Sequence, residues 1–117
     1  MASTVLVVDD HESFRRVAKM LLETEGFDVV GEAEDGASGL EAAGRLAPDW
    51  VLLDIQLPDI DGFDVAARLT AQEDAPAVIL TSSQDGTDFG TLIRRSGARG
   101  FIPKAEITGA RLQALLP

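Results

Sequence analysis

Polar side chains that could act together on a phosphoryl group follow four short apolar runs of the sequence: Asp9 and Asp10, Asp54, Thr81, and Lys104. An aspartate carboxylate can attack phosphorus and form an acyl phosphate, while an ammonium and a hydroxyl bind the oxygens of the transferring group. Asp54 has the central position in this set and is the predicted phosphoacceptor. Turns often contain Asp or Thr, so one such residue means little, but four runs that end this way indicate a shared site.

The three aspartates of this set also predict a bound cation. Carboxylates held within a few ångströms repel one another, which opposes folding unless a cation lies between them. The candidate ligands are all oxygen atoms, and hard oxygen sites suit Mg²⁺ or Mn²⁺ better than Zn²⁺. We therefore expect a magnesium site, with manganese as the alternative.

These residues can meet only if the apolar runs form one sheet. Apolar and β-branched runs alternate with amphipathic stretches, as expected for strands that are buried on both faces and separated by helices. The expected strands are residues 5–8, 28–33, 50–53, 77–80 and 99–102. Right-handed crossovers make such a (βα)₅ chain an α/β protein with an open, doubly wound parallel sheet, which binds ligands at the carboxyl ends of its strands. Pro103 cannot donate a backbone hydrogen bond and places the fifth strand at an edge.

Helical spacing of apolar residues accounts for the segments between these strands. The signals are a stripe from Phe14 to Leu22 ended by Gly26, residues 37–46 stopped by Pro48, a helix capped by Asp61, a short helix through Leu92 and Ile93, and a closing helix with Ile107, Leu112, Leu115 and Leu116. We also expect Trp50, the single tryptophan, to lie near Asp54 and report on it.

Composition limits the function classes. A chain of 117 residues, 45% of them hydrophobic, can bury the core of one domain, residues 1–117. Twenty acidic against ten basic residues give a net charge of -10, which disfavours binding to nucleic acid or an anionic membrane. The sequence has no cysteine and no apolar run long enough to cross a bilayer, so we expect a cytoplasmic protein.

Four motifs together resemble the receiver domains of bacterial response regulators: Val-Val-Asp9-Asp10, Leu-Leu-Asp54-Ile-Gln-Leu-Pro58 with Asp61-Gly62, Leu-Thr81, and Gly-Phe101-Ile-Pro-Lys104. The resemblance covers almost the whole chain and implies a flavodoxin-like fold with strand order 2-1-3-4-5. It also implies two-component signalling, in which a histidine kinase or phosphotransfer protein phosphorylates Asp54. The ending around Lys104 resembles receivers that precede helix-turn-helix outputs, so we expect a freestanding receiver or one excised from a longer regulator.

The resemblance assigns roles to individual residues. It implies that Asp9, Asp10, the Asp54 carboxylate and the backbone carbonyl of Gln56 bind the metal. Thr81 and Lys104 would bind the phosphoryl group, Phe101 would turn inward as part of a switch, and Gln56 with Ser83 would tune the phosphate lifetime. Phosphorylation is then expected to change a protein-binding face and to allow homodimers.

Two other functions share parts of the pattern. A haloacid-dehalogenase-like phosphatase also uses an aspartate nucleophile, but its second aspartate corresponds to Gln56 here, so we expect no turnover enzyme. A pseudo-receiver binds partners without phosphorylation and would lack Asp10, Asp54 or Lys104, all of which are present. His11 follows the acidic pair, and we expect it to face solvent or cap a helix, with a metal-binding role as the less favoured alternative.

Overall fold

A single sheet of five parallel strands forms the centre of the computed structural model, which describes residues 2–84 and 89–115. The strands are β1 (Thr4–Val8), β2 (Asp28–Ala33), β3 (Trp50–Asp54), β4 (Ala77–Ser82) and β5 (Gly100–Pro103). Their order is β2-β1-β3-β4-β5, as the sequence predicted. The edge position of β5 is confirmed too, and Pro103 is its last residue.

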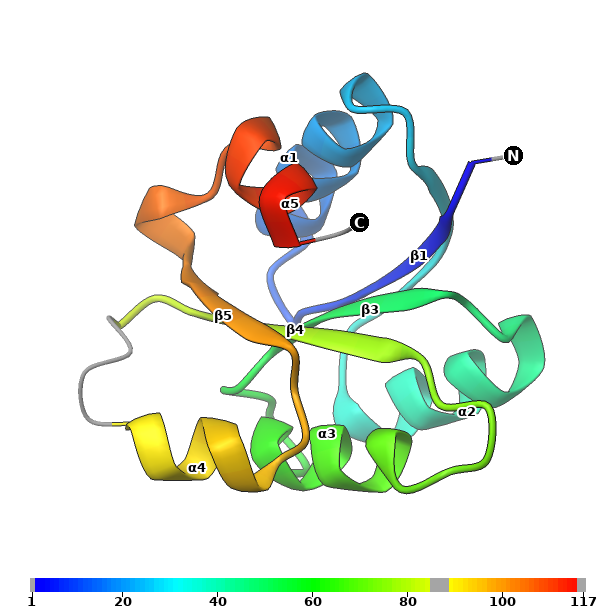
Figure 1. Ribbon diagram of the computed structural model, residues 1–117, viewed down its shortest axis with the longest axis vertical. Coiled ribbons are helices and arrows are strands. Elements are labelled where there is room, and N and C mark those ends of the chain that lie inside the picture. Colours follow the sequence, from blue (N-terminus) through cyan, green and yellow to red (C-terminus); the bar gives the residue numbers. More distant parts are fainter. Residues whose placement is uncertain (1, 85–88, 116–117) are drawn as a thin grey trace.

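Helices cover both faces of this sheet (Figure 1). The helices are α1 (Glu12–Thr24), α2 (Gly36–Leu46), α3 (Gly62–Thr70), α4 (Gly90–Arg95) and α5 (Gly109–Leu115). Helices α1 and α5 lie on one face, and α2, α3 and α4 lie on the other. The fold is therefore the doubly wound α/β arrangement expected from the sequence.

Alternation along the central strands builds two separate cores. On β1, Leu6 and Val8 pack toward α2 and α3, whereas Val5 and Val7 pack toward α1 and α5. Successive side chains of a strand point to opposite faces, so a strand covered on both faces has to be apolar throughout. This requirement explains the continuous apolar runs of the central strands, while the parallel strand order determines which strand ends lie side by side.

Local signals set the helix ends. Asp35 forms a capping box with Ser38 at the start of α2, and Asp61 accepts a hydrogen bond from the Phe63 N–H at the start of α3. Gly26 has a positive φ of 92° just after α1, a conformation that glycine adopts without strain. Ala47 ends α2 in the left-handed region, directly before Pro48.

Most predicted strand boundaries agree with the structure to within one residue, but two boundaries move by two residues. Strand β4 extends through Thr81 to Ser82, because Thr81 pairs in register with both Asp54 and Ile102. The closing helix begins only at Gly109, since a 3₁₀ turn at Lys104–Glu106 precedes it and Ile107 lies between the two. The predicted helical residue Leu116 lies outside the described residues. Among the residues described, no helix has the length and apolar character needed to span a membrane.

Candidate functional site

The carboxyl ends of β1, β3, β4 and β5 bring the predicted residues to one edge of the sheet. Asp54 ends β3 and pairs in register with Thr81 of β4. Asp9 directly follows Val8 of β1, and Lys104 directly follows Pro103 of β5. Parallel strands end at the same edge, so side chains far apart in the sequence become neighbours.

Lys104 connects two of the carboxylates. Its ammonium Nζ lies 2.7 Å from Asp9 Oδ2 and 3.2 Å from Asp54 Oδ2. The side chains are 15% exposed for Lys104, 1% for Asp9 and 2% for Asp54. Burial opposes the charge of Lys104, but its contacts with Asp9 and Asp54 outweigh burial and raise the pKa of the ammonium. Lys104 therefore stays protonated at neutral pH.

For Asp54, in contrast, burial outweighs the contacts that favour the charged form. Loss of solvent raises the pKa of the Asp54 carboxyl, and the nearby charge of Asp9 raises it further. The Gln56 N–H donates a 3.0 Å hydrogen bond to Asp54 Oδ1, and this bond and Lys104 lower the pKa but do not cancel the rise. The ionised form of Asp54 is thus less stable here than in water.

The acidic residues exceed the cations beside them. Asp9, Asp10 and Asp54, together with His11, offer ligand atoms that all lie within 4.8 Å of one another. Asp9 Oδ2 and Thr81 Oγ1 are buried and form no hydrogen bond among the described residues, although Asp9 Oδ2 is in ion-pair contact with Lys104. Buried polar atoms are normally partnered, and crowded carboxylates need a cation. The donor set fits Mg²⁺, which prefers carboxylate oxygens and water.

The loop after Asp54 is held from two sides. The Gly62 N–H donates a 3.0 Å hydrogen bond to the Ile55 carbonyl, and a Cβ at position 62 would overlap the backbone of Asp54 and Ile55. Asp59 accepts hydrogen bonds from the N–H groups of Gly36 and Ala37, at 2.7 and 2.9 Å. These bonds lower the pKa of Asp59. The loop is therefore tied to both the end of β3 and the start of α2.

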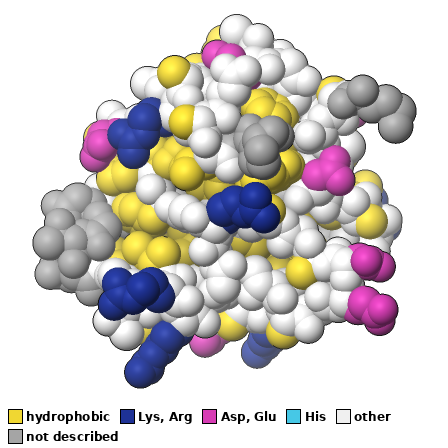
Figure 2. Space-filling view, viewed as in Figure 1, with side chains coloured by type: hydrophobic (Ala, Val, Ile, Leu, Met, Phe, Trp, Pro, Cys, Tyr) yellow, Lys and Arg dark blue, Asp and Glu magenta, His cyan; other side chains and the backbone are white. Residues whose placement is uncertain are grey.

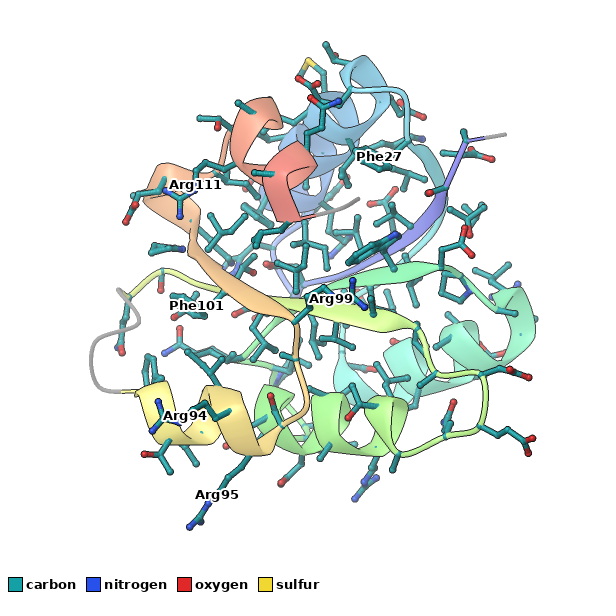
Figure 3. All side chains as sticks on the ribbon, viewed as in Figure 1. Phe27, Arg94, Arg95, Arg99, Phe101 and Arg111 are labelled. Carbon is teal, nitrogen blue, oxygen red and sulfur yellow. The ribbon has the colours of Figure 1, made fainter. Side chains whose placement is uncertain are left out.

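The residues predicted to tune the phosphate lifetime, Gln56 and Ser83, and the predicted switch residue, Phe101, also lie near this edge of the sheet. The exposed Ser83 hydroxyl donates a 3.2 Å hydrogen bond to Gln56 Oε1, which links the loops after β4 and β3. Phe101 is half-buried on β5, pairs in register with Leu80, and packs against the core shared by α2, α3 and α4. Figure 3 shows its side chain beside β5, at the same end of the sheet as α4.

A family model for the response regulator receiver domain matches residues 5–116 of this chain. The chain belongs to this family. Receiver domains of response regulators operate in two-component systems together with histidine kinases, as the sequence motifs predicted. The match and the confirmed strand order also favour this family over the phosphatase alternative.

Individual relatives of this chain are also regulators. A transcriptional regulator of Pseudomonas aeruginosa is 40% identical over 104 residues, which cover 89% of this chain and 50% of that protein. The transcription regulator BvgA of Bordetella pertussis is 39% identical over 106 residues, 91% of this chain and 51% of BvgA. The chain thus spans about half the length of these two relatives, which are regulators rather than turnover enzymes.

A solved structure supports the fold independently. The signal receiver domain of the response regulator NarL from Mycobacterium tuberculosis superposes with a TM-score of 0.85 at 37% identity. The superposition covers 97% of this chain and 96% of that one. With 97% of the chain covered, the similarity extends over nearly the whole domain rather than over one part of the sheet.

Two residues near the site of this receiver were given other roles by the sequence. Phe14, expected only in the apolar stripe of α1, has its ring 4.5 Å from Lys104 Nζ, in a cation–π contact. His11 is 65% exposed, as expected for a residue facing solvent, but its side chain caps no helix. Its ring nitrogen instead approaches Asp9 and Asp10. Apolar spacing alone could not reveal either contact, because both depend on how α1 leaves β1.

The expected position of Trp50 is wrong. Trp50 begins β3 and Asp54 ends it, so the two α-carbons are about 13 Å apart along the strand. The indole packs with the α1 and α5 core, and the Arg99 guanidinium lies 5.1 Å from its ring centroid. Trp50 and Asp54 share a strand, but they occupy its opposite ends.

Proposed function

We propose that this receiver takes a phosphoryl group onto Asp54 from a histidine kinase or phosphotransfer protein, with Mg²⁺, or Mn²⁺, bound beside it. One observation carries the proposal: Lys104 Nζ lies 3.2 Å from Asp54 Oδ2, and the register neighbour of Asp54, Thr81, has a buried hydroxyl with no hydrogen bond among the described residues. A nucleophile, an ammonium and a hydroxyl are thereby assembled around one point. Phosphoryl transfer needs such positioning and charge stabilisation more than it needs covalent chemistry from other residues.

Each residue of the site would have a separate role in the transfer. An oxygen of Asp54 forms the new bond to phosphorus while the bond to the donor's nitrogen breaks. The Lys104 ammonium pairs with one phosphoryl oxygen, and the Thr81 hydroxyl donates a hydrogen bond to another. Asp9, Asp10, Asp54 and the backbone carbonyl of Gln56 would hold the metal ion. When bound, Mg²⁺ would neutralise the negative charge that the phosphoryl group brings into an acidic site.

Phosphorylation would then change a binding face through the sheet. If Thr81 moves toward the phosphoryl group, its register neighbour Ile102 and the adjacent Phe101 on β5 must adjust. Figure 2 shows hydrophobic side chains exposed between the α4 and α5 regions on this face, with basic side chains beside them. We propose that a protein partner, or a second copy of the chain, binds this face after Phe101 turns inward. Ser83 and Gln56 would set how long the signal lasts, by limiting access of water to the phosphoryl group.

The relatives suggest the class of output. They are named as transcription regulators and are about twice as long as this chain. We propose that the receiver controls transcription through a DNA-binding partner or segment. With a net charge of -10, the receiver itself is not expected to contact DNA.

Intact-mass measurement with acetyl phosphate tests the phosphoacceptor. We expect wild type to gain the mass of one phosphoryl group only with Mg²⁺ present, and Asp54→Asn to gain none. Asp49→Asn is a matched control, because Asp49 precedes β3 at the opposite end and should leave the adduct unchanged. A folded wild-type protein that forms no adduct, with beryllofluoride also failing to bind, would make the pseudo-receiver the better description.

A further inference from the structure

The only histidine of the sequence lies against the acidic residues of the site. Nδ1 of His11 is 3.0 Å from Asp10 Oδ1 and 3.2 Å from Asp9 Oδ1. The backbone N–H of His11 also donates a 2.8 Å hydrogen bond to Asp9 Oδ1, which fixes the position of the residue. The imidazole therefore faces the carboxylates, while the rest of the ring is exposed to solvent.

These separations match the spacing of ligands around a divalent ion. Ligand atoms about 2.1 Å from a metal lie roughly 3 Å from their nearest neighbours in octahedral geometry. The ligand atoms of His11, Asp9, Asp10 and Asp54 all lie within 4.8 Å of one another.

An independent observation points to a missing cation. Among the described residues, the buried carboxylates of Asp9 and Asp54 share one ammonium, that of Lys104. The nearby Arg15 guanidinium, which donates to the Asp9 carbonyl, is paired with Glu32, so the site keeps an excess of negative charge. The hydroxyl of Thr81, the register neighbour of Asp54, is buried and has no hydrogen-bond partner within residues 2–84 and 89–115.

We propose that His11 Nδ1 is a ligand of this cation site, so that the receiver binds ions such as Ni²⁺ and Zn²⁺ through a mixed nitrogen and oxygen set. The proposal rests on the cation site in the proposed function and extends it to metal selectivity. Imidazole binds nickel and zinc well, whereas magnesium prefers oxygen. Nickel and zinc therefore gain from His11, magnesium gains little, and low concentrations of these metals displace magnesium.

A simple ion pair is the competing explanation for the same distances. A protonated imidazole would donate from Nδ1 to Asp9 or Asp10, and the proton would remain there. Ligation requires that Nδ1 lose its proton, with Nε2 keeping one. The two explanations therefore differ in what happens at one nitrogen atom when metal is added.

Nitrogen-15 NMR of the imidazole follows that atom directly. Because the chain has one histidine, protein free of any affinity tag gives a single set of imidazole signals. We expect Zn²⁺ to shift Nδ1 much more than Nε2, and Asp10→Asn to weaken this response. A shift at Nε2, or an equal response in Asp10→Asn, indicates surface binding by an exposed histidine and overturns the proposal.

Binding titrations give a second test without phosphorylation. We expect His11→Ala to weaken Ni²⁺ binding by about tenfold or more and to change Mg²⁺ binding by less than about twofold. Ser13→Ala, an exposed change on the first turn of α1, should alter neither affinity. Equal weakening of both metals would mean that His11 only positions the aspartates, which contradicts ligation.

The outcomes separate this inference from the proposed function. If wild type binds Mg²⁺ and His11→Ala binds Ni²⁺ as tightly as wild type, only the role of His11 is wrong. If wild type binds neither metal, the cation site of the proposed function fails and this inference fails with it.

Discussion

At the amino ends of the strands, Thr4 and Asp49 form a closed pair of hydrogen-bonding groups. At the carboxyl ends, the buried carboxylates of Asp9 and Asp54 share one ammonium, that of Lys104, and the Thr81 hydroxyl has no partner among the described residues. Asp49 Oδ2 accepts hydrogen bonds from the Thr4 N–H and hydroxyl, and the Asp49 N–H donates to the Thr4 hydroxyl.

The two ends of the sheet therefore serve different purposes: the amino ends stabilise the fold, and the carboxyl ends form the candidate site. Satisfied hydrogen bonds at the amino ends favour the fold, while crowded charges at the carboxyl ends oppose it until a ligand arrives. Burial of the apolar strand residues between the two ends stabilises the fold enough to offset this repulsion. Removing a crowded carboxylate at the carboxyl ends should therefore raise stability, whereas removing the cation that balances it, or a satisfied group at the amino ends, should lower it.

Removing Lys104 should have the largest effect. Lys104→Met leaves the buried carboxylates of Asp9 and Asp54 without their cation, and we expect a loss of about 2–4 kcal/mol in unfolding free energy at pH 7. Urea unfolding measures this loss. Added Mg²⁺ should restore part of it, because a cation that binds only the folded state stabilises that state. Wild-type stability in the variant would mean that Lys104 does not balance these charges.

Asp54→Asn should act in the opposite direction. The pKa of Asp54 is raised in the folded protein, so its ionisation at neutral pH costs stability that an amide would not. We expect the variant to be more stable by on the order of 1 kcal/mol at pH 7 without Mg²⁺. The gain should shrink as pH falls through the raised folded-state pKa, and vanish below the unfolded value near 3.8, where wild type is also neutral. If the variant were less stable than wild type at pH 7, the ionised Asp54 carboxylate would not be destabilising the folded protein, which contradicts this prediction.

One substitution made at both ends gives a matched comparison. Thr81→Val removes a buried hydroxyl that bonds to no described residue, so it should leave stability unchanged or slightly higher, while slowing adduct formation at Asp54. Thr4→Val removes the bonds to Asp49 and should cost about 0.5–1 kcal/mol, with adduct formation unchanged. Thermal unfolding and intact mass measure the two effects. The comparison fails if both variants lose similar stability.

Asp59 should show the smallest effect and the reverse dependence on pH. Its pKa is lowered by the N–H groups of Gly36 and Ala37, so its ionised form favours the fold. We expect Asp59→Asn to be slightly less stable than wild type above pH 4. The difference should disappear as pH falls through the lowered pKa of the folded protein, where wild type loses the same charge. Unfolding curves measured from pH 7 to pH 3 test this, and a difference that grows in acid would contradict it.

The sequence predicted the central strands β1, β3 and β4 well because each is buried on both faces and reads as a continuous apolar run. It also predicted the meeting of Asp9, Asp54, Thr81 and Lys104, since parallel strands align their carboxyl ends. Helix ends were less predictable. The 3₁₀ turn at Lys104–Glu106 and the late start of α5 at Gly109 depend on tertiary packing rather than on apolar spacing.

Side-chain contacts between different helices, strands and loops were also not predictable from the sequence. Asp59 was not expected to hold the start of α2, because the two are 23 positions apart and no local pattern joins them. The ring of Phe14 beneath Lys104 and the orientation of His11 depend on the path of α1 away from β1. Side-chain types indicated the chemistry, but their partners became visible only in three dimensions.

The position of Trp50 makes occupancy and switching separately measurable. Its indole is 6% exposed, lies beneath Arg99 at the far end of β3, and is too distant from Asp54 for a bound ion to quench it by contact. Arg99 directly precedes β5, and its N–H bonds to the Val78 carbonyl of β4. A change in tryptophan emission would therefore report that β5 has moved relative to β3. A titration in which mass shows a phosphoryl group and emission stays constant would describe a receiver that is loaded but not yet switched.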